Sequence, residues 1–142
     1  MAEQLSDELL MERLTDEMER PAFNNWLGVK GVEITPEGEI HVLLPYRPEF
    51  GFDPSRSIFH GGIIASLIDI AGYAAVAIRS SAPTPTVTLT IDYLAPAIGE
   101  ELLAKAQVRR SGRSLSRVDV DVYVGTRMVA MGRGVFSTKE PS

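Results

Sequence analysis

One carboxylate stands alone in the middle of an apolar segment. Residues 59–78 read FHGGIIASLIDIAGYAAVAI, and Asp69 is the single acidic residue among them. An unpaired carboxylate is costly to bury, so such a group normally shifts its pKa or finds a partner. Asp69 therefore either lies at a solvated edge of this segment or is held in place to perform chemistry.

Two glycines stand near the start of the same segment. If a helix begins at residue 60, Gly61 and Gly62 leave backbone N–H groups free at its N-terminus and allow a ligand to approach the backbone closely. The positive end of the helix dipole would add to these donors. The helix start and the carboxylate together form a candidate site.

A second concentration of functional groups is basic. The sequence RRSGRSLSR places four arginines around the turn at Ser111-Gly112, namely Arg109, Arg110, Arg113 and Arg117. A solvated turn is one interpretation. A site for an anionic ligand is the other, because guanidinium groups bind phosphates well.

Hydrophobic periodicity predicts the elements that position these groups. Residues 6–20 predict an amphipathic helix, with Ser6 as its N-cap and Leu10, Leu14 and Met18 on one stripe. Strands are expected at 27–34, 40–44, 86–96, 102–109, 117–124 and 127–136, and residues 46–59, with two prolines, are expected to form an irregular loop.

The predicted order is a helix, two strands, one long apolar helix over residues 60–78, and four more strands. The last three strands form an antiparallel meander with one apolar face, and such a sheet needs a cover. The segment 60–78 is apolar nearly all round, as expected for a helix wrapped by a curved sheet. We therefore predict an α+β fold, with an antiparallel curved sheet around a central helix and a further helix at the N-terminus.

Composition indicates a single domain over residues 1–142. The predicted elements divide it into a helical extension at 1–22 and a core at 23–138. The chain is 44% hydrophobic and 23% charged, which is typical of a globular domain. It has no cysteine, which excludes disulfides and thiolate chemistry, and only His41 and His60 as histidines, so we expect no metal site. The net charge of −5 argues against nucleic acid as a partner.

The sequence contains no recognisable targeting segment. Its N-terminus, MAEQLSDELLMERLTDEMER, is acidic and lacks the basic and apolar regions of a signal peptide. Residues 60–78 are near the lower length limit of a membrane span, but a central Asp69 would cost about 2.5–3.5 kcal/mol on insertion. We expect a cytoplasmic protein that does not contact a membrane.

Two motifs at proper distance carry a family resemblance. The pattern H-G-G-x₆-D, from His60 to Asp69, is followed by TVTLTIDYLAPA at residues 86–97. Together they resemble the hotdog-fold acyl-CoA thioesterases of the PaaI-like group, over roughly residues 24–137. The resemblance implies hydrolysis of an acyl-CoA thioester to a free acid and CoA, no cofactor beyond the CoA of the substrate, and assembly into homodimers or homotetramers.

The resemblance also implies a catalytic set. Gly61 and Gly62 amides would polarise the thioester carbonyl toward its oxyanion, while Asp69 would act as general base on a water molecule or attack the carbonyl itself. The sequence leaves both roles of Asp69 open. His60 would either contact the substrate or only cap the helix. Thr86 falls where relatives often place a hydroxyl beside the catalytic water, but its position also fits an ordinary strand threonine.

Substrate-binding residues follow less directly. Tyr73 lies one turn after Asp69, would share its helix face and could orient it. Ser66 is a second candidate on that helix, although it could instead be a structural partner of Asp69. The four arginines at 109–117 would contact the phosphates of CoA.

One position departs from the family pattern. Members commonly have an Asn or Gln about six residues before the histidine, which assists the carbonyl. Here that position is Pro54, with Asp53 and Ser55 beside it. Phe23 and Trp26 are expected in the core or in the acyl pocket.

The spacing along the central helix predicts a shared site. Gly62 and Asp69 are seven residues apart, or about 10 Å along a helix at ~1.5 Å per residue. Both must come within about 3–3.5 Å of the reacting atoms. Two helices running antiparallel across a two-fold axis can satisfy this demand, so we expect an obligatory dimer whose sites use both subunits.

Two other functions remain open. A hotdog hydratase or dehydratase would use a histidine to move a carbon-bound proton, and His60 with Asp69 could be placed in that role. A non-catalytic acyl-CoA binding module is the other, although a pure binder gains nothing from a buried carboxylate near an ester. The sequence does not indicate the acyl group, and aromatic, medium-chain and branched acids all remain open.

Overall fold

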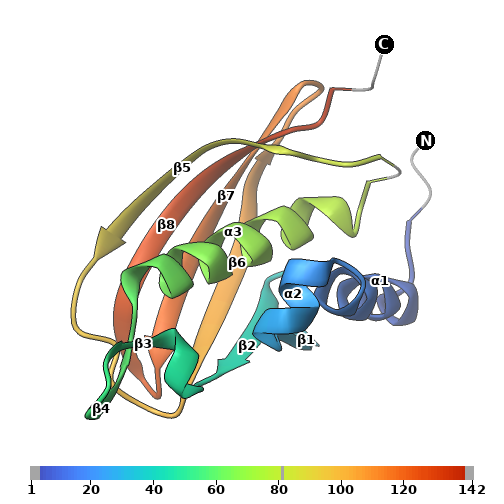
Figure 1. Ribbon diagram of the computed structural model, residues 1–142. Helices are drawn as coiled ribbons and strands as arrows, with labels where there is room; N and C mark the ends of the chain where they lie inside the picture. Colours follow the sequence, from blue (N-terminus) through green and yellow to red (C-terminus); the bar gives the residue numbers. More distant parts are fainter. Residues whose placement is uncertain (1–3, 81, 140–142) are drawn as a thin grey trace.

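An antiparallel sheet curves around one long helix in the computed structural model, which describes residues 4–80 and 82–139 (Figure 1). The N-terminal half contains α1 (Asp7–Glu19), α2 (Ala22–Leu27), β1 (Lys30–Ile34), β2 (Ile40–Pro45), the 3₁₀ helix η1 (Pro48–Phe50), β3 (Gly51–Asp53) and β4 (Arg56–Phe59). The rest contains α3 (Gly61–Ala77), β5 (Thr86–Tyr93), β6 (Glu101–Ser111), β7 (Leu115–Val124) and β8 (Arg127–Ser137).

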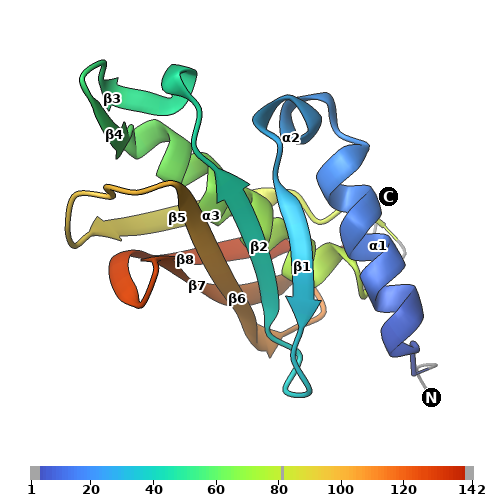
Figure 2. The same ribbon diagram turned by 90° about the horizontal axis from the view of Figure 1, so that it is seen from below.

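Six strands form the main sheet in the order β1-β2-β6-β7-β8-β5, and all neighbours are antiparallel. Strands β3 and β4 pair separately as a hairpin. The sheet wraps around α3 in Figure 1, and α1 and α2 lie beside β1 in Figure 2. This arrangement confirms the predicted α+β hotdog fold, with β5 as one edge of the sheet.

The central helix packs tightly against the sheet because its apolar side chains meet the apolar face of β6, β7 and β8. Leu67 and Ile68 of α3 and Val120 of β7 have no exposed surface. Gly72 allows the close approach, since a Cβ there would lie 2.9 Å from Cζ of Phe136. Within the described ranges, no helix combines the length and the apolar character that crossing a membrane requires.

The N-terminal helix forms as its sequence predicts. The Ser6 hydroxyl accepts a hydrogen bond from the Leu9 N–H at 3.1 Å and so caps α1. Leu14 and Met18 of its apolar stripe are buried. Leu14 lies against Gly31 of β1, where a larger residue would collide with it.

Residues 22–27 form α2, although the predicted strand starts at Leu27. Pro21 is extended and precedes the first helical residue, and Gly28 ends the helix in the left-handed region at φ 82°. The short helix therefore fits between a proline and a glycine. The strand begins at Lys30 instead.

Residues 46–59 are more ordered than the predicted irregular loop. They contain η1 and the β3–β4 hairpin, whose strands are too short to show a period. Asp53 Oδ1 closes the hairpin turn by accepting from Ser55 N at 2.9 Å and Ser55 Oγ at 2.8 Å. The His60 N–H donates to the Phe50 carbonyl at 2.8 Å, which ties the end of η1 to the start of α3.

Candidate active site

The isolated carboxylate of Asp69 meets a hydroxyl from the edge strand. Thr86, the first residue of β5, donates from Oγ1 to Asp69 Oδ1 at 2.7 Å. Within the part of the chain that the structure describes, no basic side chain pairs with Asp69 and no group donates to its Oδ2. A carboxylate that is oriented through one oxygen can accept a proton from water through the other.

The other two candidates on α3 do not bind Asp69 directly. The Ser66 hydroxyl donates to the Gly62 carbonyl at 2.9 Å, so it stabilises the first turns of the helix. The Tyr73 ring packs edge-on against Phe136, with centroids 6.4 Å apart. Both residues line the same groove as Asp69.

The start of α3 is capped by its own histidine. His60 is the N-cap residue, and its Nδ1 accepts a hydrogen bond from the Gly62 N–H at 2.9 Å. The His60 carbonyl accepts from the Ile63 N–H at 2.9 Å. The Gly61 N–H donates to no group among the residues that the structure describes. Of the two glycine amides, Gly61 is therefore the one available to a ligand.

Tyr93 is a neighbour of this helix start to which the sequence assigned no role. Its hydroxyl donates to the Gly61 carbonyl at 2.8 Å. Tyr93 stands in the strand motif TVTLTIDYLAPA, but a strand pattern does not reveal which backbone atom the hydroxyl reaches. Its role follows only from the tertiary structure.

A groove beside Asp69 runs between α3 and the N-terminal helices and has a volume of about 360 Å³. Its lining consists of Glu17, Arg20, Pro21, Phe23, Asn24, Ser66, Asp69, Ile70 and Tyr73. Several polar members already have partners: Asn24 Nδ2 donates to the Glu17 carbonyl at 2.8 Å, and Arg20 pairs with the Glu17 carboxylate at 3.1 Å. Asp69 thus opens onto a space bounded by apolar groups and by polar groups that are already bonded.

The two aromatic residues of α2 have different surroundings. Phe23 and Trp26 are 51% and 52% exposed, so neither belongs to the core, and their rings stack at 6.2 Å. Phe23 lines the groove. Trp26 lies beyond it, where the Arg47 guanidinium stands 4.7 Å from its ring centroid.

The arginine cluster divides into two parts. Arg110 and Arg117 are cross-strand partners on β6 and β7, and with Arg113 they line a hollow at the end of the hairpin. Arg109 is different, because its Nε pairs with Asp119 Oδ2 at 2.9 Å. Three of the four predicted arginines therefore share one hollow.

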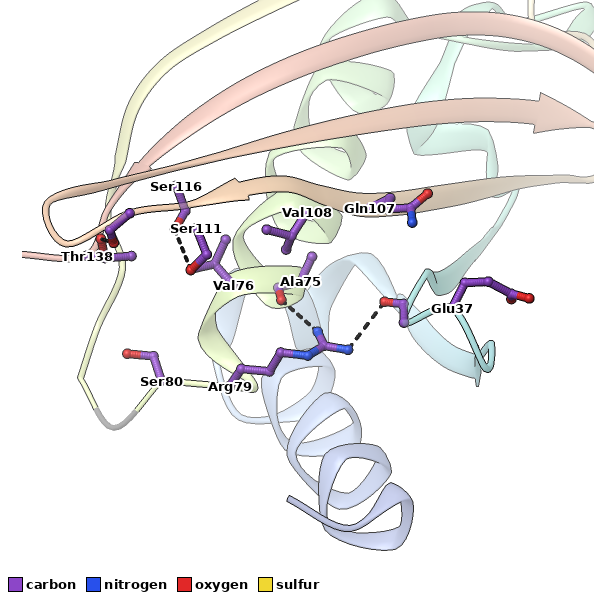
Figure 3. Close-up of a pocket in the computed structure, with 12 residues that line it drawn as sticks. Glu37, Ala75, Val76, Arg79, Ser80, Gln107, Val108, Ser111, Ser116 and Thr138 are labelled. Carbon is purple, nitrogen blue, oxygen red and sulfur yellow. Dashed lines mark hydrogen bonds between the residues drawn. The ribbon is translucent and has the colours of Figure 1, made fainter. Parts of the chain in front are cut away.

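A separate cavity lies at the C-terminal end of α3, shown in Figure 3. Arg79 donates from its guanidinium to the Ala75 carbonyl at 3.0 Å and to the Gly38 carbonyl at 3.3 Å, and burial lowers the pKa of Arg79. The Ser116 hydroxyl donates to the Ser111 hydroxyl across 3.4 Å. The bond from Arg79 to Gly38 joins the helix end to the β1–β2 turn, and the cavity is at the opposite end of α3 from His60.

The described residues contain no group of three or more His, Cys, Asp or Glu side chains that could hold a metal ion. Two features are available for chemistry: the oriented carboxylate of Asp69 in the groove, and the N-terminus of α3, which lies outside the groove lining. Within one chain these two features do not converge, because Gly62 and Asp69 are separated by about 10 Å along α3 at ~1.5 Å per residue.

The comparisons of this chain with known proteins agree on one family. Residues 57–131 match the family model described as thioesterase superfamily. The chain is 36% identical over 126 residues to a Halobacterium salinarum protein named as an esterase, covering 79% of this chain and 81% of that protein. It is 36% identical over 78 residues to mouse acyl-coenzyme A thioesterase 13, covering 52% of this chain and 56% of the relative.

A solved structure shows the same fold. The E. coli PaaI protein from the phenylacetic acid degradation operon superimposes with a TM-score of 0.82, at 22% sequence identity. The match covers 95% of this chain and 96% of the PaaI chain. The PaaI-like hotdog arrangement predicted from the motifs is thus confirmed at the level of the fold.

Proposed function

The chain belongs to the thioesterase superfamily, and on that premise we propose that it hydrolyses acyl-CoA thioesters to a free acid and CoA. The observation that carries the proposal is the contact of 2.7 Å between Thr86 and Asp69, which orients a carboxylate beside a groove. The name of the mouse relative supports CoA as the thiol part of the substrate.

In the proposed reaction, Asp69 acts as general base. Thr86 holds Oδ1, and Oδ2 accepts a proton from a water molecule as the water oxygen bonds to the thioester carbon. The tetrahedral intermediate then expels the CoA sulfur as its C–S bond breaks, and the proton on Asp69 passes to the sulfur. Direct attack by Asp69 would give an anhydride instead, which water must then hydrolyse.

The amide of Gly61 would polarise the carbonyl oxygen. It is at the N-terminus of α3, where the helix dipole also favours negative charge, and it has no partner among the described residues. Gly62 could contribute only if the His60 ring released its N–H. The structure thus supports Gly61 over Gly62 as the principal donor.

We propose that the site is completed by a second subunit. The edge strand β5 has one neighbour, β8, so its other side presents backbone N–H and C=O groups that a partner strand can pair with. Pairing two copies of β5 about a two-fold axis extends the sheet and places two α3 helices side by side. Gly61 of one subunit can then serve a thioester bound at Asp69 of the other.

The groove and the arginine hollow supply two binding regions for the substrate. The acyl group would lie in the groove lined by Phe23, Ile70 and Tyr73. The phosphates of CoA would bind Arg110, Arg113 and Arg117, which form the hollow at the β6–β7 turn. Arg109 contributes less, because Asp119 already neutralises its charge.

The alternatives are less well supported. A hydratase or dehydratase would need the His60 imidazole to take a proton from carbon, but its Nδ1 accepts from the Gly62 N–H, so the neutral ring carries its proton on Nε2 and has no free base there. A non-catalytic binding module would have no use for a carboxylate oriented beside its ligand groove.

A thiol-release assay over a panel of acyl-CoA substrates tests the proposal. Asp69→Asn should lower kcat by roughly 10²-fold or more, the scale of a general base, with the fold retained. Asp121→Asn is the matched control, because Asp121 is on β7, outside the groove and the arginine hollow. Equal turnover by wild type and Asp69→Asn on the best substrate would reject the catalytic assignment.

A further inference from the structure

One peptide unit at the start of α3 is fixed at both of its polar ends. The carbonyl of Gly61 and the N–H of Gly62 belong to the same peptide group. The carbonyl accepts from the Tyr93 hydroxyl at 2.8 Å, and the N–H donates to His60 Nδ1 at 2.9 Å. A peptide held in this way cannot rotate without losing a hydrogen bond.

The preceding peptide is also held at one end. The His60 carbonyl accepts from the Ile63 N–H at 2.9 Å, as expected in the first turn of a helix. Its other end is the Gly61 N–H, which has no partner in the described part of the chain. The unpaired amide is therefore flanked by atoms that all have partners, and its direction is set by theirs.

The Tyr93 ring adds a steric contact to the hydrogen bond. A Cβ built on Gly61 would lie 3.4 Å from Tyr93 Cε1 and 3.5 Å from its hydroxyl oxygen. The ring thus lies directly against the Gly61 backbone. Tyr93 itself comes from the last position of β5, so it joins the edge of the sheet to the helix start.

We infer that Tyr93 is a positioning residue for the reaction: its hydroxyl holds the Gly61 carbonyl and, together with the bond on the His60 carbonyl, restrains rotation about the Gly61 backbone, so that the Gly61 N–H keeps the direction in which it polarises the thioester. The inference rests on the proposed function. It assigns to Tyr93 an effect on the transition state, where the charge on the carbonyl oxygen is largest, rather than on substrate binding.

Glycine makes such a restraint necessary. Without a Cβ, Gly61 and Gly62 can adopt many backbone conformations, and two adjacent glycines would leave the helix start poorly defined. The hydrogen bonds from Tyr93 and to His60 remove that freedom while leaving room for a ligand at the amide. A preorganised donor stabilises an oxyanion better than one that must reorient during the reaction.

The test compares Tyr93→Phe with Tyr123→Phe. The first variant removes the hydroxyl and keeps the ring, and Tyr93 is 53% exposed, so the fold should persist. Tyr123 is on β7, outside the groove and the hollow, and its variant should behave as wild type. The measurements are kcat and KM in the thiol-release assay and the NMR chemical shifts of the Gly61 carbonyl carbon and amide nitrogen.

Tyr93→Phe should move both Gly61 chemical shifts and lower kcat by roughly tenfold, with KM unchanged. A tenfold loss is roughly the scale expected from losing one hydrogen bond, here the one from Tyr93 to the Gly61 carbonyl. Unmoved Gly61 shifts would overturn the inference, because the hydroxyl would then not hold this peptide. Moved shifts with unchanged kcat would overturn it too. Failure of the proposed function is seen separately, in a wild type that cleaves no thioester.

Discussion

Thr86 and Asp69 are joined by a hydrogen bond of 2.7 Å, although they belong to different elements and are 17 residues apart. The bond fixes the middle of α3 to the beginning of β5. Because the hydroxyl donates to only one carboxylate oxygen, it selects the orientation in which the other oxygen is available to water. The edge strand thereby takes part in the proposed chemistry.

Removing this hydroxyl should slow the reaction without blocking substrate binding. We expect Thr86→Val, which has nearly the same shape, to lower kcat by roughly tenfold with little change in KM. Thr86→Ser should keep most of the activity, because it retains the donor. Thr88→Val, two residues further along β5, is the control, and an equal loss in both valine variants would show that the strand rather than the hydroxyl is responsible.

The arginine hollow predicts a salt-dependent KM. Arg113→Ala should raise KM for acyl-CoA more than it lowers kcat, because Arg113 would contact phosphates far from the reacting carbon. Added salt should raise the wild-type KM and have a smaller effect on the variant.

The control for this experiment is Arg127→Ala. Arg127 begins β8, at the β7–β8 turn, and does not line the hollow. Steady-state kinetics at several salt concentrations are sufficient. If KM responds neither to Arg113→Ala nor to salt, the arginine cluster is an ordinary solvated turn and does not bind CoA.

Phe23 should influence which acyl groups are accepted. It lines the groove beside Asp69 and is half exposed, so Phe23→Ala enlarges the groove without opening the core. We expect kcat/KM to shift toward bulkier acyl groups, by about 10-fold for each well-fitted addition of one or two methylenes. Val32→Ala, an exposed apolar residue on β1, is the control. An unchanged order of substrates would place the acyl group elsewhere.

The sequence predicts the central features of the site because they depend on local pattern. A long apolar segment with a single carboxylate identifies α3, and the two glycines mark its first turn. The role of Thr86 follows from the family resemblance, and its contact with Asp69 is compatible with that role. To predict these features, it is sufficient to recognise the helix, the strand and their separation along the sequence.

Two kinds of feature escaped prediction: contacts between distant residues, and local conformations for which the sequence allows more than one outcome. The role of Tyr93 requires the end of β5 to meet the start of α3, 32 residues away. The bond between His60 and Gly62 is local, but the sequence equally allowed His60 to contact substrate. The helix α2 is too short for a helical period to show, and the predicted strand at 27–34 overlaps it only at Leu27.

Two neighbouring aspartates on β7 should affect stability in opposite directions. Burial and the nearby carboxylates of Asp119 and Glu39 raise the pKa of Asp121. A carboxyl with a raised pKa in the folded protein destabilises it once ionised: the penalty is absent below the unfolded pKa and complete above the folded one. Asp121→Asn should therefore raise the free energy of unfolding at pH 7, and the gain should fade as the pH falls toward about 4.

Asp119→Asn should lower the free energy of unfolding, because Asp119 pairs with Arg109 at 2.9 Å and Arg133 at 3.3 Å. Both effects should stay below about 1 kcal/mol, since these groups are partly solvated. Urea unfolding of the two variants at pH 7 and pH 4.5 measures them. Two shifts of the same sign at pH 7 would contradict the assignment.

The shared site makes a prediction about mixed dimers. Asp69→Asn removes the base, and Gly61→Val places a branched side chain against the Tyr93 ring and disturbs the amide. Each protein should be nearly inactive alone. If one site takes Asp69 from one subunit and Gly61 from the other, a mixed dimer has one site with both defects and one site with neither. Since random exchange makes half of the dimers mixed, about one quarter of the wild-type sites should be restored.

A second mixture controls for nonspecific recovery. Asp69 and Thr86 are in direct contact within one subunit, so mixing Asp69→Asn with Thr86→Val creates no intact site. Its activity should remain the average of the two parent proteins. Subunit exchange in both mixtures can be verified with differently tagged chains by native mass spectrometry. If verified exchange gives no recovery in the first mixture, Gly61 and Asp69 do not serve one thioester across a two-fold interface, and the proposed dimer geometry is wrong.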